Sequence, residues 1–141
     1  MLVKHLSIFL ENKRGRFTEV AKILGDANIN LTAFTVAENS DFGILRLIVS
    51  DVDKAIEILK EQRYAVSVTD VVCLRCPNVP GSLAKVMEII TNAEVFVEYM
   101  YAFSQGEDAN IVIRPDNLER CVEVLKANKL ALIAANDLYK L

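Results

Sequence analysis

Two short segments of the chain have the residue types expected of an anion-binding loop. The clearer one, Asn78-Val79-Pro80-Gly81-Ser82-Leu83, lies between an apolar β-prone segment and an amphipathic helical pattern. Pro80 has a fixed φ, Gly81 permits backbone conformations that side chains forbid, and the helix start beyond it presents unpaired N–H groups. Such a loop can hold a carboxylate through backbone donors and the helix dipole. An ordinary strand-to-helix turn is the structural alternative.

The second segment is a weaker copy of the first, 66 positions upstream. Asn12-Lys13-Arg14-Gly15-Arg16-Phe17 has an asparagine, a glycine and an apolar helix-opening residue at the same places. The same offset also pairs Val20 with Val86 and Leu59 with Leu125. We interpret these matches as an internal duplication, which favours a binding loop over a chance turn.

The hydrophobic periodicity predicts the element order βαββαβ in each copy. In the first copy, strands are expected over residues 3–11, 31–38, 43–49 and 64–68, with helices that open at Phe17 and after Asp51. In the second copy, strands are expected over residues 72–76, 95–103, 109–114 and 130–136, with helices that open at Leu83 and near Leu118. Residues 136–141 form a short tail that can extend the last strand.

These elements predict an α+β fold of two tandem ferredoxin-like βαββαβ units, with antiparallel sheets and helices on one face. The units are expected at residues 1–69 and 70–141, joined without a flexible linker. Residues 43–49 carry aliphatic side chains on both faces of their strand. A sheet face without helices is normally polar, so this pattern predicts that another sheet or subunit covers it. We therefore expect a homodimer.

Two βαββαβ units, each with an Asn-x-x-Gly loop before its first helix, resemble a tandem pair of ACT domains over essentially the whole chain. Asn28-Ile29-Asn30-Leu31 also resembles the family pattern at the entry to the second strand. ACT domains usually sit beside catalytic domains of amino-acid metabolism and bind an amino acid where two ACT units meet. The resemblance thus implies a non-catalytic regulatory or sensor protein that binds a small-molecule ligand, an amino acid, at such an interface. It implies no cofactor, and a metabolic enzyme as a partner.

The resemblance also implies which residues would contact the ligand. They belong to the two loops and to the start of the second strand of each copy: Asn12, Arg14, Gly15, Arg16, Phe17, Leu31 and Thr32 in copy one, and Asn78, Val79, Pro80, Gly81, Ser82, Leu83, Val97 and Glu98 in copy two. Copy one departs from the family pattern, because Lys13-Arg14 stands where copy two has Val79-Pro80. Copy two is therefore favoured. Glu98 can pair with a ligand ammonium group or be a solvated strand residue.

Other chemistry receives less support from the sequence. Cys73-Leu74-Arg75-Cys76 is a CxxC pattern, but on a strand this spacing places the two thiols on opposite faces. Small metal-chaperone domains share the predicted topology, so a metal or redox role of Cys73 and Cys76 stays an alternative. Cys121 is expected in the core. His5 is the only histidine, and no catalytic set can be built around it.

Composition excludes several classes of function. A net charge of −3 and a pI of about 5.2 argue against nucleic-acid binding. An RNA-binding domain of this topology would need aromatic residues on the strand at 43–49, which has none. Neither a membrane span nor a signal peptide is evident, and three cysteines imply no disulfide framework. We expect a cytoplasmic protein. A second interpretation is an oligomerisation or docking module that regulates a metabolic enzyme without binding a ligand.

Overall fold

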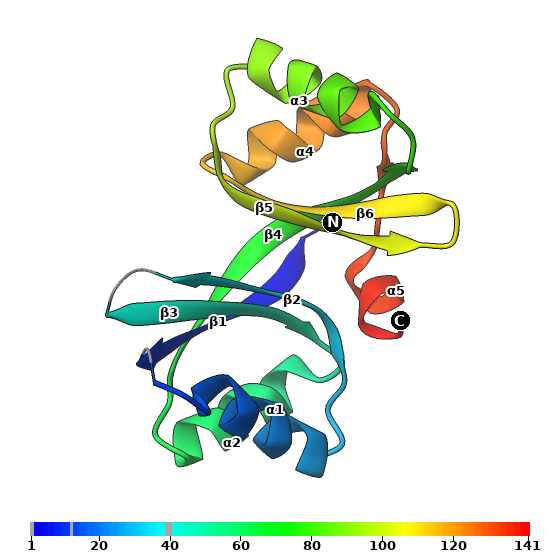
Figure 1. The fold of residues 1–141 in the computed structure, drawn as a ribbon. Coiled ribbons are helices and arrows are strands. Elements are labelled where there is room, and N and C mark those ends of the chain that lie inside the picture. Colours follow the sequence, from blue (N-terminus) through cyan, green and yellow to red (C-terminus); the bar gives the residue numbers. More distant parts are fainter. Residues whose placement is uncertain (1, 12, 39–40) are drawn as a thin grey trace. The chain divides into compact units, whose positions relative to one another are not determined.

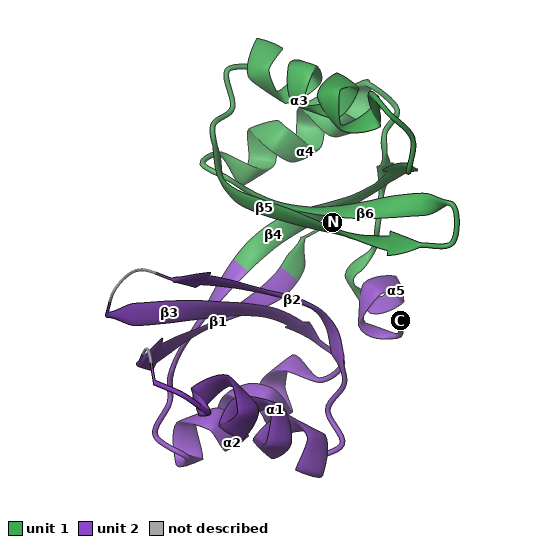
Figure 2. Cartoon of the chain, viewed as in Figure 1, with its two compact units in different colours: residues 1–3, 70–135 green, residues 4–69, 136–141 purple. Residues whose placement is uncertain are grey.

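The computed structural model describes residues 2–11, 13–38 and 41–141. The chain divides into two compact units (Figure 2). Residues 4–69 and 136–141 form the N-terminal unit, and residues 1–3 and 70–135 form the C-terminal unit. Each unit takes most of its residues from one half of the sequence. Each end of the chain, however, is grouped with the unit built from the other half of the sequence.

The N-terminal unit has the expected βαββαβ order (Figure 1). Its elements are β1 (Val3–Glu11), α1 (Arg16–Asp26), β2 (Leu31–Glu38), β3 (Phe42–Val49), α2 (Val52–Glu61) and the first residues of β4 (Ala65–Pro77). The strand order is β2-β3-β1-β4, and the β1–β3 and β2–β3 pairs are antiparallel. Both helices cover the same face of this sheet (Figure 1).

The core of the N-terminal unit follows from the period of two along its central strands. Leu6 and Ile8 of β1 and Leu45 and Leu47 of β3 all point to the helical face, where they pack with residues such as Leu24 of α1. The alternate positions point away from the helices. His5 is one of these and is fully buried.

The C-terminal unit repeats this arrangement. It contains the second part of β4, followed by α3 (Ser82–Asn92), β5 (Val97–Gln105), β6 (Asp108–Pro115), α4 (Leu118–Ala127) and β7 (Ala131–Leu132). Strands β5, β6, β4 and β7 lie side by side in that order, each antiparallel to its neighbour. The α+β prediction with antiparallel sheets is confirmed.

The helix ends use the same local devices in both units. Asp51 and Asn117 accept hydrogen bonds from the N–H groups of Lys54 and Arg120 and so cap α2 and α4. After each of the four long helices the chain passes through a left-handed residue, at Asn28, Arg63, Glu94 and Lys129. Asparagine, which stands at Asn28, is one of the residues that tolerate this conformation.

Two details of the predicted elements are wrong. Strand β4 is continuous over 13 residues, where the sequence analysis placed two strands at 64–68 and 72–76. The predicted strand at 130–136 is reduced to the two residues of β7, and helix α5 (Ala135–Tyr139) follows. The reason is tertiary: Leu138 is fully buried, and Tyr139 packs against the core of the N-terminal unit. The Tyr139 hydroxyl also accepts the Lys4 N–H at 2.8 Å.

Candidate functional site

The β4–α3 loop presents its glycine at the start of the helix. Strand β4 ends at Pro77 and α3 begins at Ser82, so Gly81 is the residue before the first helical turn. Its φ of 90° and ψ of −13° are left-handed, a conformation that glycine adopts without strain. The Ser82 N–H donates to the Val79 carbonyl at 3.2 Å, which closes the turn. The backbone conformation at this position therefore favours glycine over other residues.

The start of α3 has features expected of an anion site. Within the described part of the chain no side chain caps the helix, although cap side chains normally satisfy one of the first N–H groups. A Cβ built on Gly81 meets no atom within 4 Å, so the space beside the loop is open. Val79 and Leu83, which flank the glycine, are also exposed. Backbone donors and the positive end of the helix dipole thus adjoin open space.

A shallow groove of about 460 Å³ lies beside this loop. Pro77, Asn78 and Val79 line one side, and Gly106, Glu107 and Asp108 of the β5–β6 turn line the other. The Asn78 N–H donates to the Glu107 carbonyl at 3.0 Å and ties the two sides together. The sequence analysis did not include Glu107 and Asp108 in the site, because adjacent carboxylates in a turn are usually explained by solvation.

The predicted residues at the start of the second strand lie at equivalent irregularities. The β2–β3 register shifts between Leu31 and Ala33, and the β5–β6 register shifts between Val97 and Tyr99. Thr32 and Glu98 therefore occupy the same bulge in the two copies. The Thr32 hydroxyl oxygen is buried without a hydrogen-bond partner among the described residues. The Glu98 carboxylate lies 3.5 Å from Arg114 Nε, so it already has a cationic partner.

The first loop has the same backbone and different side chains. Gly15 precedes α1 with φ 85° and ψ −3°, and again no side chain caps the helix among the described residues. Phe17 contacts Phe34 of β2, with ring centroids 5.7 Å apart. Arg14 is exposed, and Asn12 lies outside the described residues. The two loops belong to different units, so they are two separate candidates.

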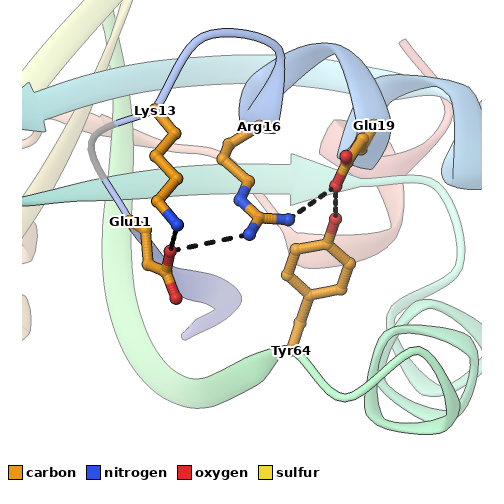
Figure 3. A network of polar contacts seen from close by, with 5 residues as sticks. All are labelled: Glu11, Lys13, Arg16, Glu19 and Tyr64. Atoms are coloured by element: carbon orange, nitrogen blue, oxygen red, sulfur yellow. Dashed lines mark hydrogen bonds and ion pairs between the residues drawn. The ribbon is translucent and has the colours of Figure 1, made fainter.

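A network of five polar side chains surrounds the start of α1 (Figure 3). Arg16 lies 3.5 Å from Glu11 and 3.1 Å from Glu19, Lys13 lies 2.9 Å from Glu11, and the Tyr64 hydroxyl donates to Glu19 at 2.7 Å. The hydrogen bond and charge of Lys13, with a smaller contribution from Arg16, lower the pKa of Glu11. The Tyr64 hydrogen bond, followed by that of Arg16, lowers the pKa of Glu19.

This network borders a larger groove, of about 660 Å³, that the sequence analysis missed. Among the residues that the structure describes, Arg16 is the only predicted site residue that lines it. The others come from β1, from the outer face of α1 and from residues 62–65, where the chain leaves α2. The strand and helix patterns gave no signal for this groove, because its parts are about 40 residues apart in the sequence and meet only in the folded unit.

The burial of the three cysteines disfavours a metal or redox role for them. Cys76 packs in the core of the C-terminal unit under the helices, whereas Cys73 is buried but is not part of that core. Burial raises the pKa of Cys73 to about 12, that of Cys121 to about 11, and that of Cys76 above its usual value. A thiolate is the reactive and metal-binding form of cysteine, and burial disfavours it. The described residues include no group of three or more His, Cys, Asp or Glu side chains suited to a metal ion.

The fold and the repeated glycine loop define a tandem ferredoxin-like protein with one candidate small-molecule site in each unit. The chain belongs to the ACT domain pair family, whose sequence model matches residues 1–141. The resemblance drawn from the loops and the duplication is thereby confirmed. None of the curated proteins matches the chain.

Solved structures share this fold over nearly the whole chain. Protein BT0572 from Bacteroides thetaiotaomicron is 59% identical, with 100% of this chain and 98% of that chain covered and a TM-score of 0.96. The ligand-free regulatory subunit of aspartate kinase from Thermus thermophilus is 10% identical, with 88% and 90% covered and a TM-score of 0.65. The corresponding subunit from Thermus flavus is 14% identical, with 90% and 94% covered and a TM-score of 0.61. At such low identity the two subunits show the fold alone.

The helices of the chain do not have the character of membrane spans. Among residues 2–11, 13–38 and 41–141, none is both long enough and apolar enough to cross a bilayer.

Proposed function

We propose that this chain is a non-catalytic regulatory or sensor protein that binds an amino acid at the β4–α3 loop. The observation that carries the proposal is the left-handed Gly81 before an uncapped helix start that adjoins open space. The carboxylate of the ligand accepts hydrogen bonds from the first N–H groups of α3, where the helix dipole also favours negative charge. The same backbone at Gly15 is the second candidate.

The β5–β6 turn supplies negative charge that can bind the ammonium group of an amino acid. Glu107 and Asp108 line the groove opposite Asn78 and Val79 and offer carboxylates to the ligand ammonium group. At about 460 Å³ the groove is large enough for an amino acid, since small-molecule sites are commonly 300–1,000 Å³. Glu98 is a weaker partner for the ammonium, because Arg114 already lies beside its carboxylate.

We further propose that the protein forms a homodimer through the edges of its sheets, which brings the loop of one chain near a second ACT unit. Strands β2 and β5 end the strand order, and an unpaired edge is a template for another strand. On β2, Phe34 and Val36 are more than half exposed. Phe34 also contacts Phe17 at the start of α1. Such apolar side chains at an edge favour a partner of like character.

The proposal includes an enzyme of amino-acid metabolism as the regulated partner and places the protein in the cytoplasm. The two Thermus proteins of similar fold are regulatory subunits of aspartate kinase, which supports a regulatory role on a separate enzyme chain. Three free cysteines stay reduced in that compartment.

The first experiment is a thermal-shift panel of the twenty amino acids and common nucleotides, with calorimetry on every hit. A ligand at 100 times its dissociation constant stabilises the fold by about 2.7 kcal/mol, which is readily detected. Gly81→Ala and Gly15→Ala are a matched pair, because both glycines are left-handed and neither Cβ would meet an atom of the described residues within 4 Å. We expect Gly81→Ala to abolish the response and Gly15→Ala to preserve it. A hit unaffected by either variant would refute the loop as the site.

A second variant tests the role assigned to the turn. Glu107→Gln removes a side-chain charge and keeps the backbone carbonyl that binds Asn78. We expect it to weaken the binding of an amino-acid hit and to leave the binding of the deaminated 2-keto acid unchanged. Equal losses for the two compounds would contradict an ammonium contact.

The exposed edges also support the second candidate function, a docking module without a ligand. Hydrogen exchange separates the two functions. A ligand protects the amides of residues 81–84, whereas docking alone protects the edge strands β2 and β5. A flat ligand panel together with edge protection would favour the docking module.

A further inference from the structure

The groove of about 660 Å³ in the N-terminal unit has an apolar wall and a charged wall. Leu10 of β1, which belongs to the core on the helical face, and Ile23 of α1 form the apolar wall. Arg16 and Lys22 from α1 and Arg63 from the end of α2 are its cations. This combination of apolar surface and a few placed charges is typical of a small-molecule site.

One part of the charged wall is already satisfied within the protein. Arg16 bridges the carboxylates of Glu11 and Glu19, and Tyr64 donates to Glu19 at 2.7 Å (Figure 3). Lys13 provides a second cation for Glu11 at 2.9 Å. Two carboxylates are thus matched by two cations within the protein.

The two remaining cations of the groove are not matched. Within the described residues, neither Lys22 nor Arg63 takes part in an ion pair or a side-chain hydrogen bond. The chain as a whole has a net charge of −3. The groove lining carries three cations and two carboxylates, a local excess of positive charge on a protein whose net charge is negative. An excess of one sign in a concave site attracts the opposite sign.

The position of Arg63 adds a conformational argument. Its φ is 65°, in the left-handed region where glycine is favoured after a helix. The Arg63 N–H donates to the Lys60 carbonyl at 2.9 Å, so this backbone is built into the helix end. The other three long helices end in the same way, at Asn28, Glu94 and Lys129. At Arg63 this common helix end places a guanidinium at the groove.

We propose that this groove is a second ligand site, separate from the glycine loop of the C-terminal unit, and that it binds a small organic anion. A carboxylate or phosphate group lies between Lys22 and Arg63, since guanidinium and ammonium groups bind both. The apolar body of the ligand lies against Leu10 and Ile23. The binding does not depend on the amino-acid site proposed above.

The duplication predicts that only one such site exists in each chain. At the positions 66 residues later, Pro77 replaces Glu11, Ser82 replaces Arg16 and Glu88 replaces Lys22. The second copy therefore lacks the bridging arginine and has the opposite charge at the lysine position. Lys129, which corresponds to Arg63, keeps the left-handed backbone with φ 58°.

The test is an NMR titration of the ¹⁵N-labelled full chain with phenyl phosphate, phenylacetate and neutral benzyl alcohol. We expect saturable shifts at the amides of residues 9–11, 19–23 and 62–65 with at least one anion, and at least tenfold weaker binding of benzyl alcohol. Tighter binding of phenyl phosphate would assign phosphate esters, and tighter binding of phenylacetate would assign carboxylates. No saturable shift with either anion, or equal binding of the neutral compound, would overturn the proposal.

Two variants separate ligand binding from folding. Arg63→Gly is expected to weaken anion binding at least tenfold while the melting temperature stays unchanged or rises, because glycine relieves the left-handed backbone. Lys129→Gly makes the same backbone change in the other unit and should leave binding unchanged. Lys22→Ala should also weaken binding at least tenfold, whereas Gly81→Ala should not. Wild-type affinity in Arg63→Gly would refute the site even if the amino-acid proposal holds.

Discussion

Replacement of Gly81 by alanine isolates the backbone requirement of the candidate loop. Gly81 has φ 90°, and a Cβ there meets no atom within 4 Å, so no steric clash contributes. A left-handed conformation costs an L-residue about 1–2 kcal/mol. Alanine restricts the unfolded chain and returns about 0.4–1 kcal/mol of this. We therefore expect Gly81→Ala to lower the free energy of unfolding by about 1 kcal/mol.

The assay is urea unfolding followed by circular dichroism at 25 °C, with the denaturant slope m compared between variants. A lower midpoint at constant m reports a change in stability alone. Gly25→Ala is the matched control, because Gly25 lies within α1, has no positive φ, and also has open space at its Cβ. Alanine there should raise the free energy of unfolding by about 0.5–1 kcal/mol.

Opposite signs for the two variants would establish that Gly81 is held left-handed. If Gly81→Ala is as stabilising as Gly25→Ala, the loop does not have the described backbone, and the argument for a preformed anion site fails. Gly15→Ala should match Gly81→Ala, since its φ is 85°.

Three further predictions concern titratable groups. Burial and the Arg46 charge lower the pKa of His5 from 6.5 to about 4 in the folded protein. As the pH falls, His5 is therefore protonated in the unfolded chain before it is protonated in the folded one. Lowering the pH from 7 to 5 should then reduce the free energy of unfolding by about 2 kcal/mol. Urea unfolding at both pH values checks this, and His5→Gln should remove most of the difference. Tyr64→Phe should raise the pKa of Glu19, because the Tyr64 hydrogen bond is the largest cause that lowers it; an unchanged ¹³C titration would contradict that bond. The three buried thiols should resist iodoacetamide at pH 8 until urea is added, since burial raises the pKa of Cys73 to about 12. Mass spectrometry of the native protein detects any labelling that occurs before urea is added.

The sequence determined the fold class, the duplication and the family, because these depend on patterns that repeat along the chain. The period of two in β1 and β3 and the helical spacing in α1 reflect which face each residue buries. The glycine loops were visible because a left-handed position strongly favours glycine, and Gly15 and Gly81 occur at the same place in both copies. Asp51 and Asn28 similarly marked helix ends through local chemistry.

The tertiary structure alone decided the features that join distant segments. Residues 130–136 are apolar enough for a strand, but the burial of Leu138 and the packing of Tyr139 against the core draw the end of the chain into helix α5. The groove beside Arg16 combines residues 9–11, 16–23 and 62–65, and the turn at Glu107 faces a loop almost 30 residues earlier. Local propensity depends on residues within a few positions of one another, whereas these contacts form only when each unit folds and brings distant segments together.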